Sequence, residues 1–249
     1  MCRNELVFHD QNTRTHHSMV RVINLNKDQI MRAMDYAAAA YRKIQPYSEN
    51  KFTVAIEALD CDIEYYLRRE GDTLTITFRG TDSIRNWITD FDFWKRSIPY
   101  DNVSSKIRVH KGFLDAYKSF GVRDQILRSV TDRVRHVKIS GHSLGAALSV
   151  LCAVDIEYNF PDKDIEVVLF GCPRVGNRAF MKSYNKRVYK TVRVENGNDI
   201  VTKVPFAFMG FRHVGARLNI GCPSIPGYFS AYDHYPHRYY SSLYKEFMP

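Results

Sequence analysis

The sequence predicts an α/β fold built on one mostly parallel central sheet with helices on both faces. From Gly112 onward, strand-like and helix-like segments alternate, which is typical of βαβ units. The chain has 249 residues, of which 45% are hydrophobic, enough for one large core. No linker rich in Pro, Gly or Ser divides the chain. We therefore expect residues 1–249 to form a single domain.

The N-terminal third predicts one helix followed by a small strand meander. Apolar residues at helical spacing in an Ala-rich segment indicate a helix over about 27–45 that packs on the domain. Asn26 or Asp28 would cap its start, and Pro46 would end it. A hairpin turn is expected at 70–72. Alternating apolar residues predict three strands, at 52–56, 63–67 and 74–78.

The remainder of the chain predicts helix and strand in turn. The expected elements are a helix at 112–130, a strand at 134–140, a helix at 144–158, a strand at 165–170, a helix at 178–186 and a strand at 188–194. Parallel strands need crossover connections, which are usually helices. This order therefore places helices on both faces of one continuous sheet.

Charge and composition exclude several classes of protein. The chain has a formal net charge of +9, but its basic residues occur in scattered pairs, so nucleic acid is not an expected partner. The composition lacks any collagen-like, low-complexity or repeat pattern. The longest mostly apolar stretch, 146–154, is far too short to span a bilayer, so we expect no transmembrane segment.

The N-terminal residues and the cysteines bear on the compartment. The start of the sequence lacks the apolar core of a signal peptide, which by itself indicates an intracellular protein but leaves the compartment unknown. Five cysteines without a CxxC pair argue against a disulfide framework and against a structural zinc site. We expect free, partly buried thiols instead.

The main chemical signal is the sequence Gly-His-Ser-Leu-Gly at 141–145. It follows a predicted strand and opens an apolar helix, which is the context of a nucleophile elbow. Such an abrupt turn strains its central residue, and glycines two places either side leave room for it. Ser143 would then stand at a helix N-terminus, where N–H groups favour developing negative charge. The alternative is that Ser143 only caps the helix.

A serine nucleophile needs a base and an orienting carboxylate, which in this architecture follow it in the order acid, histidine. Asp199 is the best-placed acid, because it lies on a loop after a predicted strand. Weaker candidates for the acid are Asp162, Asp164 and Asp233. Three histidines follow the elbow and could be the base: His213, His234 and His237. His142 lies within the elbow, where we expect local packing or hydrogen bonding.

Six motifs between about residues 73 and 239 resemble, in the same order, those of the fungal-type class 3 lipases. They are FRGTDSIRNW at 78–87, VHKGF at 109–113, GHSLG at 141–145, GCPRVGN at 171–177, NDIV at 198–201 and the Asp-His pair at 233–234. The resemblance implies an α/β-hydrolase fold. Many members of this family are secreted, in contrast to the intracellular location indicated above.

The resemblance also implies a role for each site residue. Ser143 would be the nucleophile, Asp199 the acid and His234 the base. Thr81 and Leu144 would form the oxyanion hole. The pattern agrees, because Thr81 ends a predicted strand after a glycine, and the Leu144 N–H supplies a second donor at the start of a helix. Neither a metal nor an organic cofactor is implied.

The segment after Thr81 predicts a short amphipathic helix. Its apolar side chains stand at i, i+3, i+4 and i+7, namely Ile84, Trp87, Ile88 and Phe91. The resemblance implies that this segment, about 83–94, is a lid that also contacts substrate. It would cover an apolar acyl groove in water and lie on the interface at a lipid surface. The alternative is an ordinary helix docked on the core.

Together these features predict a serine ester hydrolase, a lipase that cleaves acylglycerols at a lipid–water interface through an acyl-enzyme. Feruloyl esterase, phospholipase A1 and mono- or diacylglycerol lipase activities stay open on the same scaffold. A non-catalytic lipase-like signalling or binding module is the alternative of another class, and the complete Ser, Asp and His set disfavours it. The expected partners are the lipid ester and, transiently, a lipid surface, and the positive charge favours an anionic one. The protein itself is expected to be a monomer.

Overall fold

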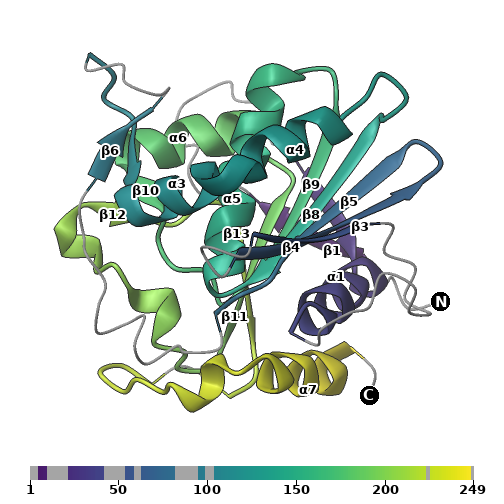
Figure 1. The fold of residues 1–249 in the computed structure, drawn as a ribbon. Coiled ribbons are helices and arrows are strands. Elements are labelled where there is room, and N and C mark those ends of the chain that lie inside the picture. The colour runs from purple at the N-terminus through teal and green to yellow at the C-terminus, as the bar shows by residue number, and fades with distance from the viewer. Residues whose placement is uncertain are drawn as a thin grey trace.

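The computed structural model describes residues 5–9, 22–41, 54–58, 63–81, 95–98, 104–222 and 225–247. Its largest sheet has seven strands among these residues, in the order β13-β11-β9-β8-β5-β4-β3 (Figure 1). The strands are β3 (Val54–Ala58), β4 (Ile63–Glu70), β5 (Thr73–Phe78), β8 (His136–His142), β9 (Asp164–Phe170), β11 (Thr191–Asn196) and β13 (Ala216–Ile220).

The sheet is mostly parallel, as the sequence predicts. β5, β8, β9, β11 and β13 pair in parallel, whereas β3 and β4 join the β5 edge as an antiparallel meander. The tight turn between β4 and β5 lies at Gly71 and Asp72, and Gly71 adopts a φ of +59°. The meander and the βαβ part therefore share one sheet, which confirms the predicted fold class.

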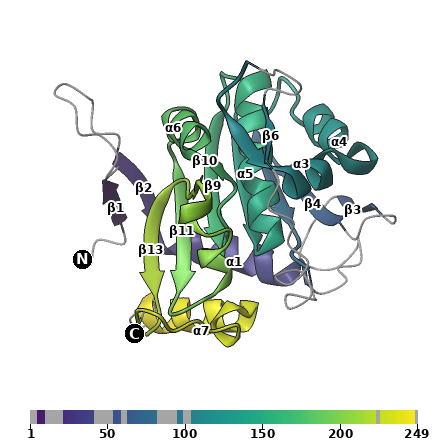
Figure 2. The same ribbon diagram turned by 90° about the vertical axis from the view of Figure 1, so that its left-hand side faces the viewer.

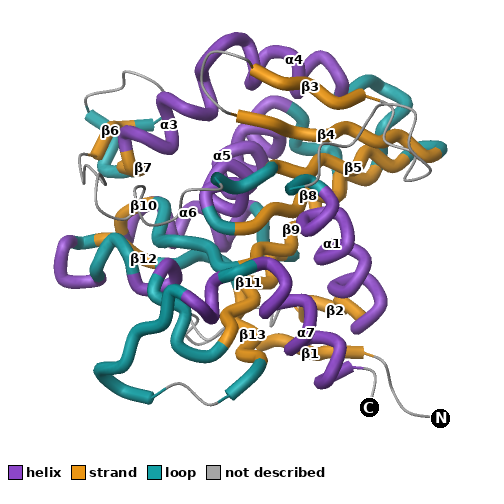
Figure 3. The backbone as a smooth tube through the Cα atoms, turned by 60° about the horizontal axis from the view of Figure 1, so that its bottom comes forward, coloured by secondary structure: helices purple, strands orange, loops and turns teal. Residues whose placement is uncertain are grey.

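Helices cover both faces of this sheet, with α5 on one side and α1 and α7 on the other (Figure 3). The side chains of β9 show the division, because Val167 and Leu169 pack with the α5 side while Val168 and Phe170 pack with α1 and α7. The helices are α1 (Lys27–Ala39), α3 (Lys111–Lys118), α4 (Val122–Ser129), α5 (Leu144–Asn159), α6 (Arg178–Arg187) and α7 (Pro236–Phe247).

Smaller elements surround the main sheet. A second sheet has the order β12-β10-β7-β6, and β1 pairs with β2 in an antiparallel ribbon. These strands are β1 (Glu5–His9), β2 (Val22–Asn26), β6 (Lys95–Ser97), β7 (Arg108–His110), β10 (Gly176–Asn177) and β12 (Phe211–Arg212). Four short 3-10 helices are η1 (Ser119–Gly121), η2 (Val201–Lys203), η3 (Ala207–Met209) and η4 (Tyr232–His234).

The N-terminal helix begins as predicted and ends sooner. Asn26 caps α1, its side chain accepting from the Gln29 N–H while the Gln29 side chain accepts from the Asn26 N–H, which is a capping box. The helix was predicted to reach about residue 45 but ends at Ala39. Tyr41 then lies in a turn, and its phenol is hydrogen-bonded to His142 outside the helix.

Two further expectations are corrected by the structure. The single helix predicted at 112–130 is broken into α3 and α4, because Gly121 adopts a left-handed conformation with φ +75° between them. The predicted strand at 188–194 begins later, at Thr191, since Val188 forms the C-cap of α6. No described helix is long and apolar enough to cross a membrane.

Candidate active site

Ser143 occupies a strained turn between β8 and α5. It has φ +60° and ψ −126°, and no other non-glycine residue in the described ranges has a positive φ. A Cβ on Gly141 would lie 2.5 Å from the backbone of Gly145, so only glycine fits there. The Ser143 N–H donates to the Phe170 carbonyl oxygen at 3.0 Å. The turn thus has the strained strand-to-helix geometry that a nucleophile elbow requires.

The end of β5 packs directly against this elbow. A Cβ on Gly145 would lie 2.4 Å from the Phe78 carbonyl oxygen, and one on Gly80 would lie 2.7 Å from that of His142. Thr81 follows Gly80 and is therefore held beside the turn that carries Ser143. Leu144 is the first residue of α5, and the first N–H groups of a helix have no acceptor within it. Each member of the predicted oxyanion pair is therefore a neighbour, along the chain, of a glycine that packs at this contact.

Asp199 and His234 form a buried hydrogen-bonded pair. The distance from His234 Nδ1 to Asp199 Oδ2 is 2.8 Å, and both side chains are fully buried. Gly171 makes room for the pair, since a Cβ there would lie 2.8 Å from His234 Cε1 and 3.0 Å from Asp199 Oδ2. The structure therefore brings together two residues that are 35 positions apart in the sequence.

Two further donors fix the Asp199 carboxylate. The Val201 N–H donates to Oδ1 at 2.8 Å, and the Tyr239 phenol donates to Oδ2 at 2.5 Å. Burial and the nearby Asp199 charge raise the pKa of Tyr239 well above its usual value, so its proton stays in place as a donor. Because the carboxylate can only accept, His234 Nδ1 carries the proton and Nε2 is left as the basic atom.

A pair of polar atoms in the described part of the chain, Ser143 Oγ and His234 Nε2, is free to form new hydrogen bonds. Within the described residues, neither Ser143 Oγ nor His234 Nε2 has a hydrogen-bond partner, although both atoms are buried. Both residues also touch the end of β9: Ser143 N–H bonds to Phe170, and the His234 ring borders Gly171. A buried base and a buried hydroxyl without other partners are what proton transfer between them requires.

His142 contacts His234 from within the elbow. Its ring lies over that of His234, with centroids 4.5 Å apart, and its Nε2 is 2.7 Å from the His234 carbonyl oxygen. Burial, followed by the nearby His234, lowers the pKa of His142 well below its usual value, so this imidazole is neutral. The sequence predicts local contacts for His142, and this is wrong: its ring hydrogen-bonds to a residue 92 positions away in the chain.

The other candidates for the acid and the base have different contacts in the structure. His213 Nε2 donates to the Thr202 carbonyl at 2.7 Å, and His237 is exposed and stacks on Tyr235. Asp233 accepts from the Asn198 N–H at 2.9 Å, whereas the other two weaker candidates form ion pairs at the surface: Asp162 with Lys163 and Asp164 with Lys190.

Three supporting residues were given no individual role from the sequence: Tyr41, Tyr239 and Gly171, the last within the GCPRVGN motif. Gly171 follows the apolar run of β9, and a glycine directly after a buried strand is a usable signal for a close approach. The two tyrosines give no comparable signal, because a tyrosine in an amphipathic helix reads as an ordinary core residue.

The predicted lid, with Ile84, Trp87, Ile88 and Phe91, lies outside the described residues. Nothing in the described ranges groups three or more metal-binding side chains. The thiols of Cys152 and Cys172 are free and buried and that of Cys222 is free and exposed, as expected for these three. Burial raises the pKa of Cys172 to about 12, which leaves it unreactive.

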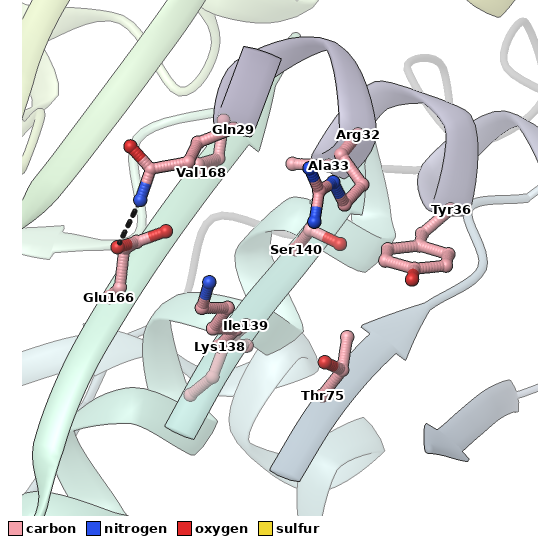
Figure 4. A pocket seen from close by; sticks show the side chains of 10 residues that line it. All are labelled: Gln29, Arg32, Ala33, Tyr36, Thr75, Lys138, Ile139, Ser140, Glu166 and Val168. Atoms are coloured by element: carbon pink, nitrogen blue, oxygen red, sulfur yellow. Dashed lines mark hydrogen bonds between the residues drawn. The ribbon is translucent and has the colours of Figure 1, made fainter. Parts of the chain in front are cut away.

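A recess beneath α1 is separate from this site. It lies between α1 and the sheet and is lined by side chains such as Arg32, Lys138 and Glu166, with Gln29 donating to Glu166 at 3.3 Å (Figure 4). Its volume is about 40 Å³, too small for an organic substrate, and no triad residue lines it.

Comparison with known proteins agrees with the geometry. The model of the family described as lipase (class 3) matches residues 75–209. A lipase of Rhizomucor miehei is 38% identical over 151 residues, which cover 57% of this chain and 40% of that protein. A chloroplastic phospholipase A(1) of Arabidopsis thaliana is 35% identical over 149 residues, covering 53% of this chain and 33% of that protein. The matches thus span less than half of either relative.

Solved structures match over more of their length. A triacylglycerol lipase whose catalytic centre is described as a serine protease triad superposes with a TM-score of 0.72 at 27% identity, covering 84% of this chain and 92% of that one. The triacylglyceride lipase of Rhizomucor miehei gives a TM-score of 0.71 at 27% identity, covering 83% and 92%.

Proposed function

The chain belongs to the class 3 lipase family, and on that premise we propose that it hydrolyses lipid esters through a triad of Ser143, His234 and Asp199. The observation that carries the proposal is the fully buried His234–Asp199 pair at 2.8 Å, which lies beside the strained Ser143 elbow. A capping serine alone would need neither the strain nor the pair.

The chemistry follows from the atoms already placed. His234 Nε2 takes the Ser143 proton while Oγ attacks the ester carbonyl, and Asp199 stabilises the imidazolium that forms. The N–H groups of Leu144 and Thr81 would stabilise the tetrahedral oxyanion. His234 then protonates the departing alcohol. A water molecule, deprotonated by the same nitrogen, hydrolyses the acyl-serine and restores the hydroxyl.

Exposed aromatic side chains favour a lipid surface as the site of action. Phe208, within η3, stacks on Phe206 with ring centroids 5.5 Å apart, and Phe208 is 87% exposed. A second exposed group lies in the segment 225–235, with Ile225, Tyr228, Phe229, Tyr232 and Tyr235. Both segments adjoin the loop that carries Asp199, since Ser230 pairs with it and η3 follows it. Exposed apolar groups of this size mark interaction surfaces.

The substrate class is best proposed as acylglycerols, with phospholipids as the second candidate. The second candidate is supported by the phospholipase A(1) relative from Arabidopsis thaliana, matched at 35% identity. Among the acylglycerols, mono- and diacylglycerols are supported by a relative from Fusarium solani, 28% identical, that is a mono- and diacylglycerol lipase. Initial rates on tri-, di- and monoacylglycerols, phosphatidylcholine and a feruloyl ester would rank these substrates.

Covalent labelling tests the proposal itself. A serine-directed alkyl phosphonate should attach once per molecule of the wild-type protein and should not attach to Ser143→Ala. Peptide mapping should place the label on Ser143. A folded wild-type protein that never reacts would instead be a non-catalytic lipase-like module, and the proposed function would be wrong.

A further inference from the structure

We propose that a polar cleft next to the catalytic loops binds a phosphate group, at a site separate from the one that attacks the ester. The cleft has a volume of about 330 Å³ and lies between α7 and the turns that follow β11 and β13. The residues that matter here are Gly197, Gly221, Asp233, Arg238, Ser242 and Lys245. None of them belongs to the triad or to the proposed oxyanion hole.

The cleft stands where open parallel sheets place their ligands. β11 and β13 run parallel, with Asn196 opposite Ile220, and both end at the cleft. Figure 2 shows these two strands pointing toward α7. Crevices outside the carboxyl ends of parallel strands are common binding sites in such folds, because the loops there are free to vary.

One face of α7 presents cationic and hydroxyl groups to the cleft. Arg238, Ser242 and Lys245 lie at i, i+4 and i+7, so they share a helix face. Within the described ranges, neither Arg238 nor Lys245 forms an ion pair with a carboxylate. Two cations seven residues apart on one wall, with a hydroxyl between them, match the charge and acceptor pattern of a phosphate group.

Arg238 is held in place and has a donor to spare. Its guanidinium carbon lies 4.6 Å from the centroid of the Tyr232 ring, which fixes the plane of the group. Its Nε–H is buried and has no acceptor among the described residues. A buried charged donor without an acceptor is unfavourable, so this nitrogen points to a ligand that would satisfy it.

The opposite wall is backbone that comes close to the helix. Gly197 and Gly221 have φ values of +48° and +73°. A Cβ on Gly221 would lie 2.3 Å from Asn196 Oδ1 and 3.1 Å from Ser242 Oγ, so only glycine keeps this side of the cleft open. The glycines thus combine a permitted left-handed turn with space for a ligand.

Among the described residues the Asp233 carboxylate forms no ion pair with Arg238 or Lys245, because the turn after β11 holds it. Its Oδ2 accepts from the Asn198 N–H at 2.9 Å, and its carbonyl accepts from the Asn196 side chain at 2.9 Å. Glu246 is the other acidic residue of the lining and is exposed. Since Asp233 precedes His234 and Asn198 precedes Asp199, a ligand in the cleft contacts the turns that hold the base and the acid.

The first test measures binding, not hydrolysis, so it is independent of the proposed lipase activity. Inorganic phosphate should raise the thermal midpoint of the wild-type protein in a saturable way, whereas sodium chloride at equal ionic strength should not. In Arg238→Gln/Lys245→Gln the dissociation constant for phosphate should rise about tenfold or more, the effect of losing one charge-assisted hydrogen bond.

A matched variant separates the site from general charge. Arg128→Gln/Lys182→Gln removes the same two charges from exposed positions on α4 and α6 and should bind phosphate like the wild type. Lys245→Gln alone changes one exposed residue in the last turn of α7, so it gives a folded variant in which weaker binding should still be seen. If phosphate raised the thermal midpoint equally in the wild type and in all three variants, the proposal would be wrong.

A second measurement distinguishes free phosphate esters from lipid headgroups. Vesicles of phosphatidylcholine containing phosphatidylglycerol are sedimented with the wild type and with Arg238→Gln/Lys245→Gln. Loss of both vesicle binding and phosphate binding in the double variant supports a headgroup site. Loss of phosphate binding alone supports a site for free phosphate esters. Retention of both would show that the cleft binds no phosphate.

Discussion

The phenol of Tyr41 donates a hydrogen bond to Nδ1 of His142, with 2.7 Å between the two atoms. The direction of this hydrogen bond is set by the other ring nitrogen. Nε2 faces the His234 carbonyl oxygen, which can only accept. A neutral imidazole has one N–H, so Nε2 carries it and Nδ1 accepts. Tyr41 therefore fixes the tautomer of His142, and His142 in turn holds the backbone of the proposed base.

Replacing Tyr41 by Phe should lower the free energy of unfolding by about 1–3 kcal/mol, because His142 Nδ1 would stay buried without a donor. Urea unfolding measures this loss. The matched control is Tyr244→Phe, which removes the same hydroxyl from an exposed position and should change stability by less than about 0.5 kcal/mol. Equal effects would mean that the Tyr41 hydrogen bond does not support the site.

The contrast between the elbow and the Tyr41 contact shows what a sequence can predict. Ser143 was found because its signal is local: a strand, two glycines at fixed spacing and a helix. The Tyr41–His142 bond joins residues 101 positions apart, and no local pattern marks it. Tertiary packing decided which tyrosine of the Ala-rich segment reaches the site.

The same reasoning explains the errors in the fold. The parallel strands β8 and β9 were predicted because buried strands read as apolar runs. β13 was missed because its side chains alternate between half-buried and exposed positions, and it lies at the edge of the sheet. The break at Gly121 was missed because a glycine inside a helical pattern is tolerated as often as it ends the helix.

Two substitutions at Ser143 should separate chemistry from strain. Both Ser143→Ala and Ser143→Gly should reduce ester hydrolysis by about 10⁵-fold or more, since either removes the nucleophile. Alanine keeps the Cβ at φ +60°, whereas glycine relieves it. The free energy of unfolding of Ser143→Gly should therefore be about 1 kcal/mol higher than that of Ser143→Ala. Identical stabilities would show that the elbow stores no backbone strain.

Stability should fall as the pH drops below about 6.5, partly through two buried histidines. Burial lowers the pKa values of His142 and His213 well below 6.5. Between the folded and unfolded pKa values the unfolded chain binds more protons, so each group reduces the free energy of unfolding by up to about 1.4 kcal/mol per pH unit. Above about pH 7 the two histidines are neutral in the folded and in the unfolded chain, so they do not change the free energy of unfolding with pH.

A variant isolates this contribution from that of the carboxylates. His213→Gln keeps a donor toward the Thr202 carbonyl but cannot titrate, so its free energy of unfolding should vary less with pH between about 7.5 and 5.5 than that of the wild type. The control is His237→Gln, at an exposed position, which should leave the slope unchanged. A wild-type slope in His213→Gln would mean that His213 binds protons equally in the folded and unfolded states, against the lowered pKa.

Phe208 should matter for substrate at an interface more than for substrate in solution. Its ring is 87% exposed and stacks on Phe206 next to the loop that carries Asp199. If the ring enters a lipid surface, the transfer is worth about 1.5–3 kcal/mol, so Phe208→Ser should weaken adsorption by about ten- to a hundredfold. The rates of the wild type and of Phe208→Ser are measured on a short ester below and above its solubility limit. The two rates should differ only above that limit. Tyr158→Ser changes an aromatic side chain that is 62% exposed near the far end of α5, and should leave both rates unaltered. An equal loss in both variants would assign the effect to general hydrophobicity and leave Phe208 without a role in adsorption.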